Sequence, residues 1–278
     1  MKKFTVSSFI DLKDFTDCTY PQGSFYLSAL LRASDVRVNG VKVNKNVRLK
    51  PGDEVAYYTT PKQEQKPSHS VIYADEFLLA ADKESGVSTE ALACELGLNP
   101  VHRLDRNTSG LIVFAKTAEA EERLLKAFKE RTVSKEYICA VKSCFKKECG
   151  ICTAYLRKNS SEGRVEIFAS QKSDCVKIIT EYEVLQKCGD CALVNVRLHT
   201  GKTHQIRAHM AYLGCPVLGD EKYGDESFNK KYGVKRQMLV SKRMAFTLFN
   251  KNYKLESPRD IILSPAPAVA LQDGEPNN

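Results

Sequence analysis

The segment HRLDRNTSG, residues 102–110, places one acid among two arginines and a histidine. It leads directly into the apolar stretch 111–115, which predicts a buried strand, and its Ser-Gly pair predicts a turn at the start of that strand. Nearby cations favour the ionised form of a carboxyl group. From these residues alone, Asp105 is either a nucleophile or base held at a strand start, or a structural acid in an Asp–Arg loop pair.

A second segment, THQIRAH at residues 203–209, has the pattern of a short amphipathic helix. We expect this helix to span about residues 204–213, with Thr203 as its N-cap. Its buried stripe would consist of Ile206, Met210 and Leu213. Arg207 would then share a face near the helix start with Thr203 and His204.

The three histidines around this helix do not indicate a metal site. They stand at positions 199, 204 and 209, and a spacing of five residues does not put two of them on one helical face. Metal ligands must converge at about 2 Å from the ion, so a metal site is a poor interpretation of these three residues.

Four of the ten cysteines fall into two close pairs, Cys149/Cys152 and Cys188/Cys191. Two such pairs could supply the thiolates of a zinc site, but the 35 residues between them exceed the usual spacing of about 15–20. Gly189-Asp190, inside the second pair, predicts a tight hairpin whose flanking cysteines pack as small apolar residues. A zinc-stabilised binding module is one alternative interpretation.

The composition excludes several classes of protein. With 42% apolar and 27% charged residues, the chain is neither disordered nor fibrous. Its apolar runs are far shorter than a membrane span, and the lysines at positions 2 and 3 precede no secretory signal. We therefore expect a soluble cytoplasmic protein with no membrane partner.

The positive charge is concentrated in two places. The whole chain has 42 Lys and Arg against 34 Asp and Glu. Residues 27–52 hold six basic side chains against the single acid Asp35, and a second basic run lies at residues 230–236. Such patches suit a polyanion such as a nucleic acid, although lysine and arginine also solvate ordinary protein surfaces.

The chain divides into four stretches. Residues 1–58 predict a small β-rich domain, and residues 59–70, with two prolines and no apolar side chain, predict a linker. Residues 71–263 would form the main domain. Residues 264–278 have the composition of a disordered tail.

Local patterns predict the elements of these stretches. In the first, one short helix fits near residues 27–31, and Asn39-Gly40 predicts a hairpin that puts Arg37 and Lys42 on its outer face. In the main domain a helix should begin after Thr117. The strand candidates are 71–73, 77–81, 111–115 and 192–198.

Three ordered groups of residues resemble the motif set of the RluA family of RNA pseudouridine synthases. They are His-Arg-Leu-Asp-x-x-Thr-Ser-Gly at 102–110, Lys-Glu-Tyr at 135–137, and Thr-His-Gln-Ile-Arg-x-His with Gly214, Pro216 and Gly219-Asp220 at 203–220. Weaker matches at Lys83-x-x-Gly86 and Gln237-x-Leu239 extend the similarity over roughly residues 70–263. Residues 27–58 resemble the small α-L RNA-binding domain that often precedes this catalytic domain.

The resemblance implies a fold and a reaction. The fold is α+β, with an extended, mixed but largely antiparallel sheet flanked by helices and loops. The reaction isomerises a uridine already present in structured ribosomal or transfer RNA, by moving the sugar bond from the base nitrogen to carbon 5. It uses neither a cofactor nor a metal, and the base must flip out of the RNA to react.

The resemblance also implies roles for individual residues. Asp105 would be the essential carboxylate, acting as nucleophile or base, and Arg207 would hold it with a bidentate guanidinium. Tyr137 would stack on the target base, Leu239 would line the base pocket, and Lys135 would support the site. The RNA-binding candidates are Arg103, Arg106, Arg37, Lys42, Lys202 and His204.

Three positions depart from the family pattern. Glu84 stands where proline is usual, Lys202 where arginine is common, and Val240 where histidine is frequent. The first domain has room for little more than one helix before its hairpin, where two are usual. A second hypothesis for the function is therefore a catalytically inactive RNA-binding or assembly factor of the same fold.

Overall fold

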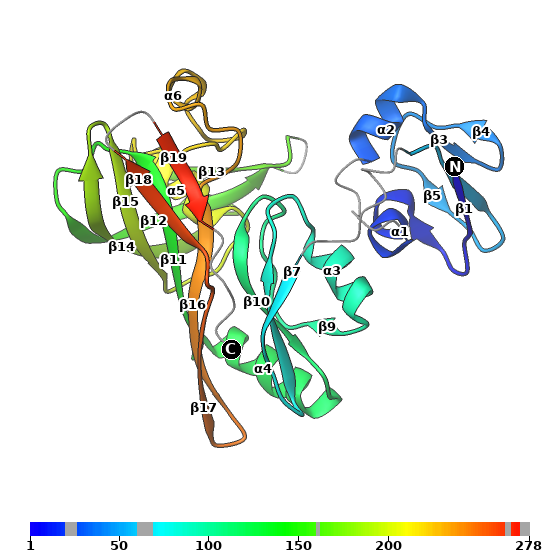
Figure 1. Cartoon of the computed structure of the whole chain (residues 1–278), viewed down its shortest axis with the longest axis horizontal. Coiled ribbons are helices and arrows are strands. Elements are labelled where there is room, and N and C mark those ends of the chain that lie inside the picture. Colours follow the sequence, from blue (N-terminus) through cyan, green and yellow to red (C-terminus); the bar gives the residue numbers. More distant parts are fainter. Residues whose placement is uncertain (20–26, 60–68, 160–161, 265–267, 273–278) are drawn as a thin grey trace.

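The computed structural model describes residues 1–19, 27–59, 69–159, 162–264 and 268–272. Two units follow each other along the chain (Figure 1). Residues up to 58 surround an apolar core of their own, and residues from 69 onward form a much larger unit. Most of the linker expected at 59–70 lies outside the described residues, and its last two residues already belong to a strand.

The described residues of the N-terminal unit form two helices and two small sheets. The helices are α1 (Leu12–Thr19) and α2 (Leu27–Ala33). One sheet has the strand order β1-β6-β3-β4, and β2 pairs with β5. The strands are β1 (Lys2–Thr5), β2 (Ile10–Asp11), β3 (Val36–Val38), β4 (Val41–Lys42), β5 (Arg48–Leu49) and β6 (Glu54–Tyr57).

The expectation of a single helix before the hairpin was wrong, because α1 precedes α2. Helix α1 is stabilised by burial of Leu12 and Phe15 rather than by strong helix-forming residues. The hydroxyls of Thr16 and Thr19 donate hydrogen bonds to the backbone carbonyls of Leu12 and Phe15, at 2.6 and 2.7 Å. These contacts tie polar residues into a helix that the sequence pattern does not predict.

The hairpin expected at Asn39-Gly40 is confirmed. Both residues have positive φ, 51° and 80°, as the tight turn requires. Arg37 and Lys42 stand opposite each other on β3 and β4. The guanidinium of Arg37 lies 4.9 Å above the ring of Tyr58, and Lys42 is exposed.

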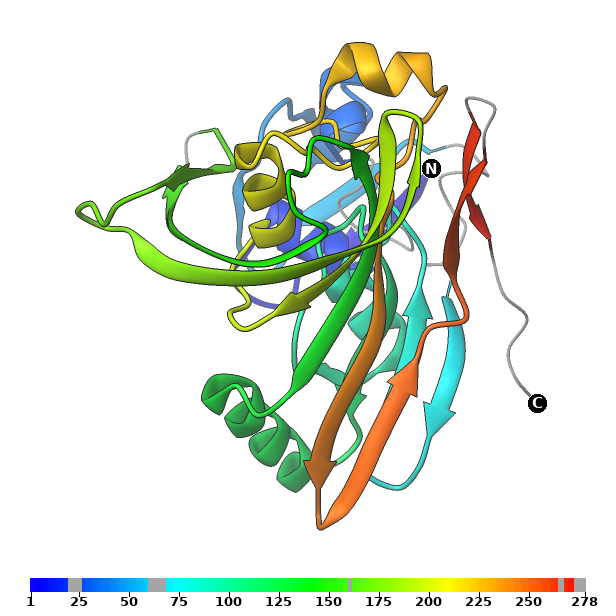
Figure 2. The same cartoon turned by 90° about the vertical axis from the view of Figure 1, so that its left-hand side faces the viewer.

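One long, twisted sheet forms the frame of the large unit (Figure 2). Its strand order is β13-β12-β14-β15-β11-β16-β10-β8-β7, with β17 added to β16 and β9 to β10. The expected sheet, mixed but largely antiparallel, is confirmed. The strands are β7 (His69–Ala74), β8 (Leu78–Lys83), β9 (Asn99–Pro100), β10 (Ser109–Ala115), β11 (Ser134–Lys142), β12 (Cys149–Asn159), β13 (Arg164–Phe168), β14 (Val176–Cys188), β15 (Cys191–Leu198), β16 (Leu239–Leu248) and β17 (Lys251–Glu256).

Among the described strands, β10 and β16 make the one parallel pairing. It joins Ser109 to Val240 and Gly110 to Ser241. Gly110 has φ +100°, and a Cβ there would lie 2.8 Å from the backbone nitrogen of Ser241 and closer still to its carbonyl oxygen. Only glycine fits this junction, which places the end of the HRLDRNTSG segment beside the start of β16.

Four helices pack around the sheet. They are α3 (Thr89–Leu96), α4 (Ala118–Glu130), α5 (Gln205–Tyr212) and α6 (Glu226–Lys231). The helix expected after Thr117 is confirmed as α4, and the Thr117 hydroxyl caps it by accepting the Ala120 N–H at 3.2 Å. No helix among the described residues is long and apolar enough to cross a membrane.

The C-terminal stretch is partly a strand, so the expectation of a disordered tail over all of 264–278 was wrong. Strand β18 (Asp260–Ser264) pairs antiparallel with β19 (Ala268–Gln272), and β18 contacts β11 and β15. The remaining tail residues lie outside the described part of the chain.

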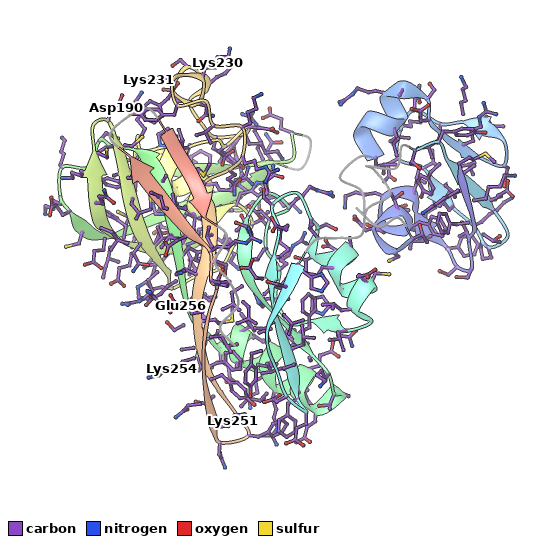
Figure 3. The ribbon with its side chains drawn as sticks, viewed as in Figure 1. Asp190, Lys230, Lys231, Lys251, Lys254 and Glu256 are labelled. Atoms are coloured by element: carbon purple, nitrogen blue, oxygen red, sulfur yellow. The ribbon has the colours of Figure 1, made fainter. Side chains whose placement is uncertain are left out.

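Figure 3 shows Lys251 near the tip of the β16–β17 hairpin, far from Lys230 and Lys231 on α6.

Candidate active site

A pocket of about 480 Å³ opens where the loop before β10, strand β11 and the start of α5 meet. It brings together most of the residues predicted from sequence, although they come from separate parts of the chain. Those that line it are Asp105, Arg207, Tyr137, Lys135, Leu239, Arg103, Lys202 and His204. Arg106, Arg37 and Lys42 are not among its lining residues.

The loop that carries Asp105 is held from several sides. Thr108 donates its N–H to the Asp105 carbonyl at 3.0 Å, and Gln237 reaches the Thr108 hydroxyl at 2.9 Å. On the other side, the buried Lys83 donates to the carbonyls of Glu84, Val87 and Arg106 at 2.8–3.0 Å. Burial lowers the pKa of Lys83 to about 7, although the Asp105 charge opposes that shift.

Arg207 connects Asp105 to a second, fully buried acid. Its Nη1 donates to Asp105 Oδ2 at 2.9 Å, while Nε and Nη2 donate to the two oxygens of Asp220 at 2.7 and 3.0 Å. The bidentate contact expected with Asp105 is therefore made with Asp220. The geometric reason is that α5 presents the Nε edge of the guanidinium to the loop of Asp220 and a single nitrogen to the pocket.

The charges of this triad reinforce one another. Burial acts to lower the pKa of Arg207, but the hydrogen bonds and charges of Asp220 and Asp105 outweigh it and raise the pKa. Burial acts to raise the pKa of Asp220, but Arg207 outweighs it and lowers the pKa. The backbone N–H groups of Lys222 and Tyr223 also bond Asp220, at 2.8 and 3.0 Å. Arg207 is thus a fixed cation beside the Asp105 carboxylate.

His204, not Thr203, is the N-cap of α5, so the expected cap was wrong. His204 has a left-handed backbone, with φ 54°, and its side chain makes no capping bond. Instead, Gln205 accepts the Lys202 N–H at 3.1 Å and closes the turn. The His204 ring faces the pocket, with Nε2 4.0 Å from Asp105 and Nδ1 3.0 Å from the Tyr223 hydroxyl. Burial lowers its pKa despite the nearby Asp105.

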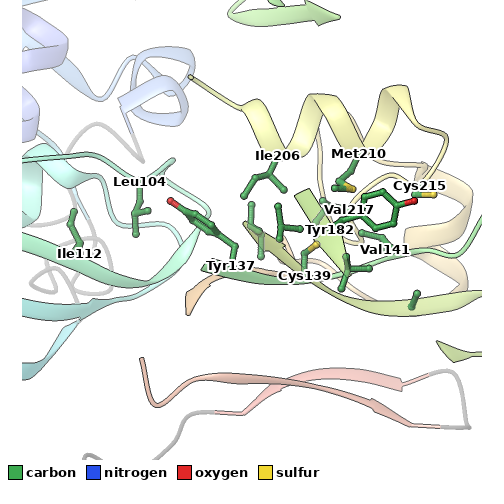
Figure 4. Close-up of a cluster of buried hydrophobic side chains, with 14 of the residues drawn as sticks. Leu104, Ile112, Tyr137, Cys139, Val141, Tyr182, Ile206, Met210, Cys215 and Val217 are labelled. Carbon is green, nitrogen blue, oxygen red and sulfur yellow. The ribbon is translucent and has the colours of Figure 1, made fainter. Parts of the chain in front are cut away.

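Tyr137 lies at one end of the main apolar core, and Figure 4 shows its hydroxyl directed toward Leu104. Burial, and after it the Asp105 charge, raises the pKa of Tyr137 to about 12. Leu239 belongs to the same core and lines the pocket. Lys135 is also buried, with its ammonium 5.7 Å from the Phe128 ring, and burial lowers its pKa. The pocket therefore has an apolar, aromatic floor beside its charged wall.

The predicted RNA-binding residues divide between three places. Arg103 is highly exposed at the pocket rim, where it pairs with Glu90 at 3.2 Å, and Lys202 is exposed at the same rim. Arg37 and Lys42 lie on the hairpin of the N-terminal unit. Arg106 points away from the pocket, and its guanidinium lies 3.9 Å from Asp17 of α1.

The two cysteine pairs lie in different parts of the large unit, and Cys149 of the first pair is exposed. Cys152 packs against the core that contains Tyr137, and Cys188 and Cys191 pack in the core under α6. The hairpin expected at Gly189-Asp190 is confirmed, with Cys188 opposite Cys191. In the described part of the chain, no three His, Cys, Asp or Glu side chains gather into a metal-binding group. Four converging thiolates, which the zinc interpretation requires, are therefore not found.

The three histidines also take separate roles. His199 bonds Glu181 at 2.8 Å on the surface, and His204 faces the pocket. His209 is buried, with Nδ1 2.9 Å from the Thr180 hydroxyl.

Sequence reasoning missed the part that Asp220 plays. The motif Gly219-Asp220 signalled the position, but only the fold shows that Asp220 orients Arg207. It also missed His102, whose Nε2 accepts the Val113 N–H at 3.0 Å and whose ring stacks on Phe128. Burial lowers the pKa of His102 to about 3, so this histidine is a neutral structural acceptor.

The arrangement can carry out chemistry on a flat, planar group. Every hydrogen bond and ion pair that reaches the Asp105 carboxylate within the described residues ends on Oδ2, so Oδ1 is the oxygen available to a substrate. The side chain is 22% exposed, and the aromatic face of Tyr137 lies in the same pocket. A carboxylate, a fixed cation and an aromatic side chain are therefore assembled around one cavity.

Comparison with known proteins gives a consistent result. The family model described as RNA pseudouridylate synthase matches residues 57–212. Ribosomal large subunit pseudouridine synthase C of Vibrio cholerae is 31% identical over 82% of this chain and 81% of its own length. The uncharacterized RNA pseudouridine synthase YlyB of Bacillus subtilis is 30% identical over 70% of this chain and 72% of its own.

A solved structure agrees with this result. Human RNA Pseudouridylate Synthase Domain Containing 1 superposes with a TM-score of 0.61 at 27% identity, covering 69% of this chain and 84% of the human one. The region that the family model matches contains the Asp105 loop, Tyr137 and the whole Arg207 helix, which the fold assembles into the pocket. The chain belongs to the RNA pseudouridylate synthase family, within the RluA group.

Proposed function

We propose that this protein converts particular uridines of large-subunit ribosomal RNA to pseudouridine. The observation that carries the proposal is the Asp105–Arg207–Asp220 triad at a pocket floored by Tyr137 and Leu239. The relatives named as ribosomal large subunit synthases support this choice of RNA over transfer RNA. We place the protein in the cytoplasm, with RNA as its partner.

In the proposed reaction, the uridine flips into the pocket and its base lies against Tyr137. Asp105 acts through its free oxygen, either on the anomeric carbon of the sugar or on the 2′ proton. The bond between the sugar and base N1 breaks, the base turns, and carbon 5 bonds to the sugar. Carbon 5 then loses its hydrogen and N1 gains a proton. Arg207 holds the carboxylate in position throughout.

The RNA-binding parts are proposed on charge and position. Arg103 stands exposed at the pocket rim, where it can fill the gap left by the flipped base, and Lys202 and His204 lie beside it. Residues 1–58, with two helices and the basic Arg37–Lys42 hairpin, would act as an α-L-like RNA-binding module. Residues 71–263 would form the catalytic domain.

The test is tritium release from RNA transcribed with uridine labelled at carbon 5, because forming pseudouridine displaces that hydrogen. Wild type should release tritium from a large-subunit ribosomal RNA transcript, and Asp105→Asn should release none above background. Asp14→Asn, an exposed acid on α1, is the matched control and should keep full activity. Tritium release only from transfer RNA would overturn the choice of substrate. A wild type that binds RNA but releases no tritium would favour an inactive assembly factor.

A further inference from the structure

Asp17 is an acid of the N-terminal unit whose carboxylate is only 2% exposed. On its own helix, Lys13 lies 3.5 Å away. Two further contacts come from the large unit. Ser88 Oγ donates to Oδ1 at 3.1 Å, and Arg106 Nη2 lies 3.9 Å from the same oxygen. A carboxylate is costly to bury without such groups, so Ser88 and Arg106 of the large unit help to compensate the burial of Asp17.

The contact with Ser88 lies at the start of α3. Ser88 is the N-cap of that helix, and its hydroxyl accepts the Ala91 N–H at 3.0 Å while it donates to Asp17. The carboxylate of Asp17 therefore lies at the positive end of the α3 dipole. Helix α1 packs beside α3 along this contact (Figure 1).

The same turn of α3 holds the catalytic loop. The Thr89 hydroxyl accepts the Leu104 N–H at 3.2 Å and donates to the Leu104 carbonyl at 3.3 Å. Glu90 pairs with Arg103 at 3.2 Å. Three successive residues of α3 thus connect Asp17 on one side with the residues that precede Asp105 on the other.

We propose that Asp17 is a positioning residue that docks the N-terminal unit on the first turn of α3 and sets its orientation relative to the Asp105 pocket. An RNA that contacts both units then meets them at a fixed spacing. Arg106, adjacent to Asp105 in sequence, serves this dock instead of the RNA. The dock itself is independent of the reaction, and its effect on catalysis rests on the proposed function.

Two native cysteines can report on the dock. Cys18, next to Asp17, and Cys94, on α3, are both exposed, and Cys94 Sγ donates to the Cys18 carbonyl at 2.8 Å. Burial, and after it the neighbouring Cys94 thiol, raises the pKa of Cys18. Diamide can join two adjacent thiols as a disulfide, because it accepts the two electrons and two protons that they lose. Cys144 and Cys215, whose sulfurs are 2.7 Å apart within the large unit, supply an internal control for the oxidation.

The first experiment measures the rate of the Cys18–Cys94 disulfide in the full chain, by mass spectrometry of unreduced peptides. Wild type and Asp14→Asn should form it readily, and Asp17→Asn should form it on the order of tenfold more slowly, since one partner of a buried charge contact is lost. The Cys144–Cys215 disulfide should form equally in all three. Formation of only the control disulfide in wild type, or an unchanged rate in Asp17→Asn, would overturn the dock.

The second experiment separates positioning from general structural support. Because Thr89 still holds the loop, Asp17→Asn should raise KM for long RNA on the order of tenfold while kcat stays within about twofold. A lost disulfide with unchanged KM would refute the positioning role, and a lower kcat with unchanged KM would show a structural role instead. If the wild type released no tritium, the proposed function would fail, but the disulfide rates would still decide the dock.

Discussion

Arg207 binds Asp105 through one nitrogen and Asp220 through two. The guanidinium is therefore oriented by Asp220, and its bond to Asp105 can change during a reaction without releasing the arginine. Asp220 itself is buried and accepts two backbone N–H groups, so it cannot follow the motion of Asp105. The triad therefore consists of a rigid Arg207–Asp220 pair that faces the reactive carboxylate of Asp105.

Replacing Asp220 should therefore damage the site while leaving Asp105 in place. We expect Asp220→Asn to lower kcat/KM roughly 100-fold, because misplaced site residues have effects of that order. The free energy of unfolding should fall by about 3 kcal/mol, because the buried guanidinium loses its main partner. Tritium release and urea unfolding measure the two effects, with Asp14→Asn as the exposed control. Wild-type kcat/KM in Asp220→Asn would show that Arg207 needs no orienting acid.

Tyr137 should act without ionising in the free protein. With its pKa raised to about 12, it keeps its proton throughout the working pH range. We expect Tyr137→Phe to lower kcat by a factor on the order of 10, because the hydroxyl is lost while the ring that stacks on the base remains. The shape of the pH–kcat profile between pH about 6 and 10 should stay the same. An alkaline limb that is present in wild type and disappears in Tyr137→Phe would contradict this prediction.

The junction between β10 and β16 should tolerate only glycine. Gly110→Ala would force a Cβ onto the backbone of Ser241 at φ +100°, and we expect a loss of 3 kcal/mol or more, about the upper end for a strained core position. Gly97→Ala is the matched control, since Gly97 also has positive φ but nothing lies within 4 Å of its added Cβ. That variant should lose only about 1 kcal/mol. Equal losses in urea unfolding would mean that backbone strain, not the close contact, dominates at Gly110.

The fold should lose stability in mild acid through His209. Burial lowers its pKa from 6.5 to about 4, so between these values the unfolded chain binds a proton that the folded chain does not. Stability contributed by the neutral ring is present above pH about 6.5 and falls by about 2 kcal/mol on going to pH about 5. His209→Asn should show a smaller loss over the same interval, because an amide in place of Nδ1 can still bond Thr180 without titrating. Identical pH dependence of unfolding in both proteins would exclude His209 as the source.

Local patterns predicted the elements whose stability is local. Helix α4 has a threonine cap and an apolar stripe, and β10 is a continuous apolar run, so both were expected at nearly their observed positions. Helix α1 was missed because its residues are poor helix formers and it is stabilised by burial of Leu12 and Phe15. Strand β19 was missed because a tail rich in proline and alanine pairs only with its neighbour β18.

In the site, too, some features could be predicted from sequence and others depend on tertiary contacts. The resemblance selected Asp105, Tyr137 and Arg207, and the fold brings all three to one pocket. It could not assign the two partners of Arg207, because that depends on the path of the loop that carries Asp220. Nor could it reveal that Arg106, one residue after Asp105, faces the opposite side of the loop and lies beside Asp17. Neighbours in sequence diverge in an extended loop, and only tertiary contacts decide where each side chain goes.

The parallel pairing of β10 with β16 has a consequence for how the protein is made. Gln237, which supports the Asp105 loop through Thr108, is synthesised 129 residues after it. At cellular translation rates this interval lasts on the order of 10 seconds. During this time the apolar strand β10 of the growing chain has no β16 to pair with along one edge. An unfinished chain therefore carries Asp105 without the segment that completes its pocket. Isomerase activity should accordingly arise only after Gln237 and strand β16 have been made.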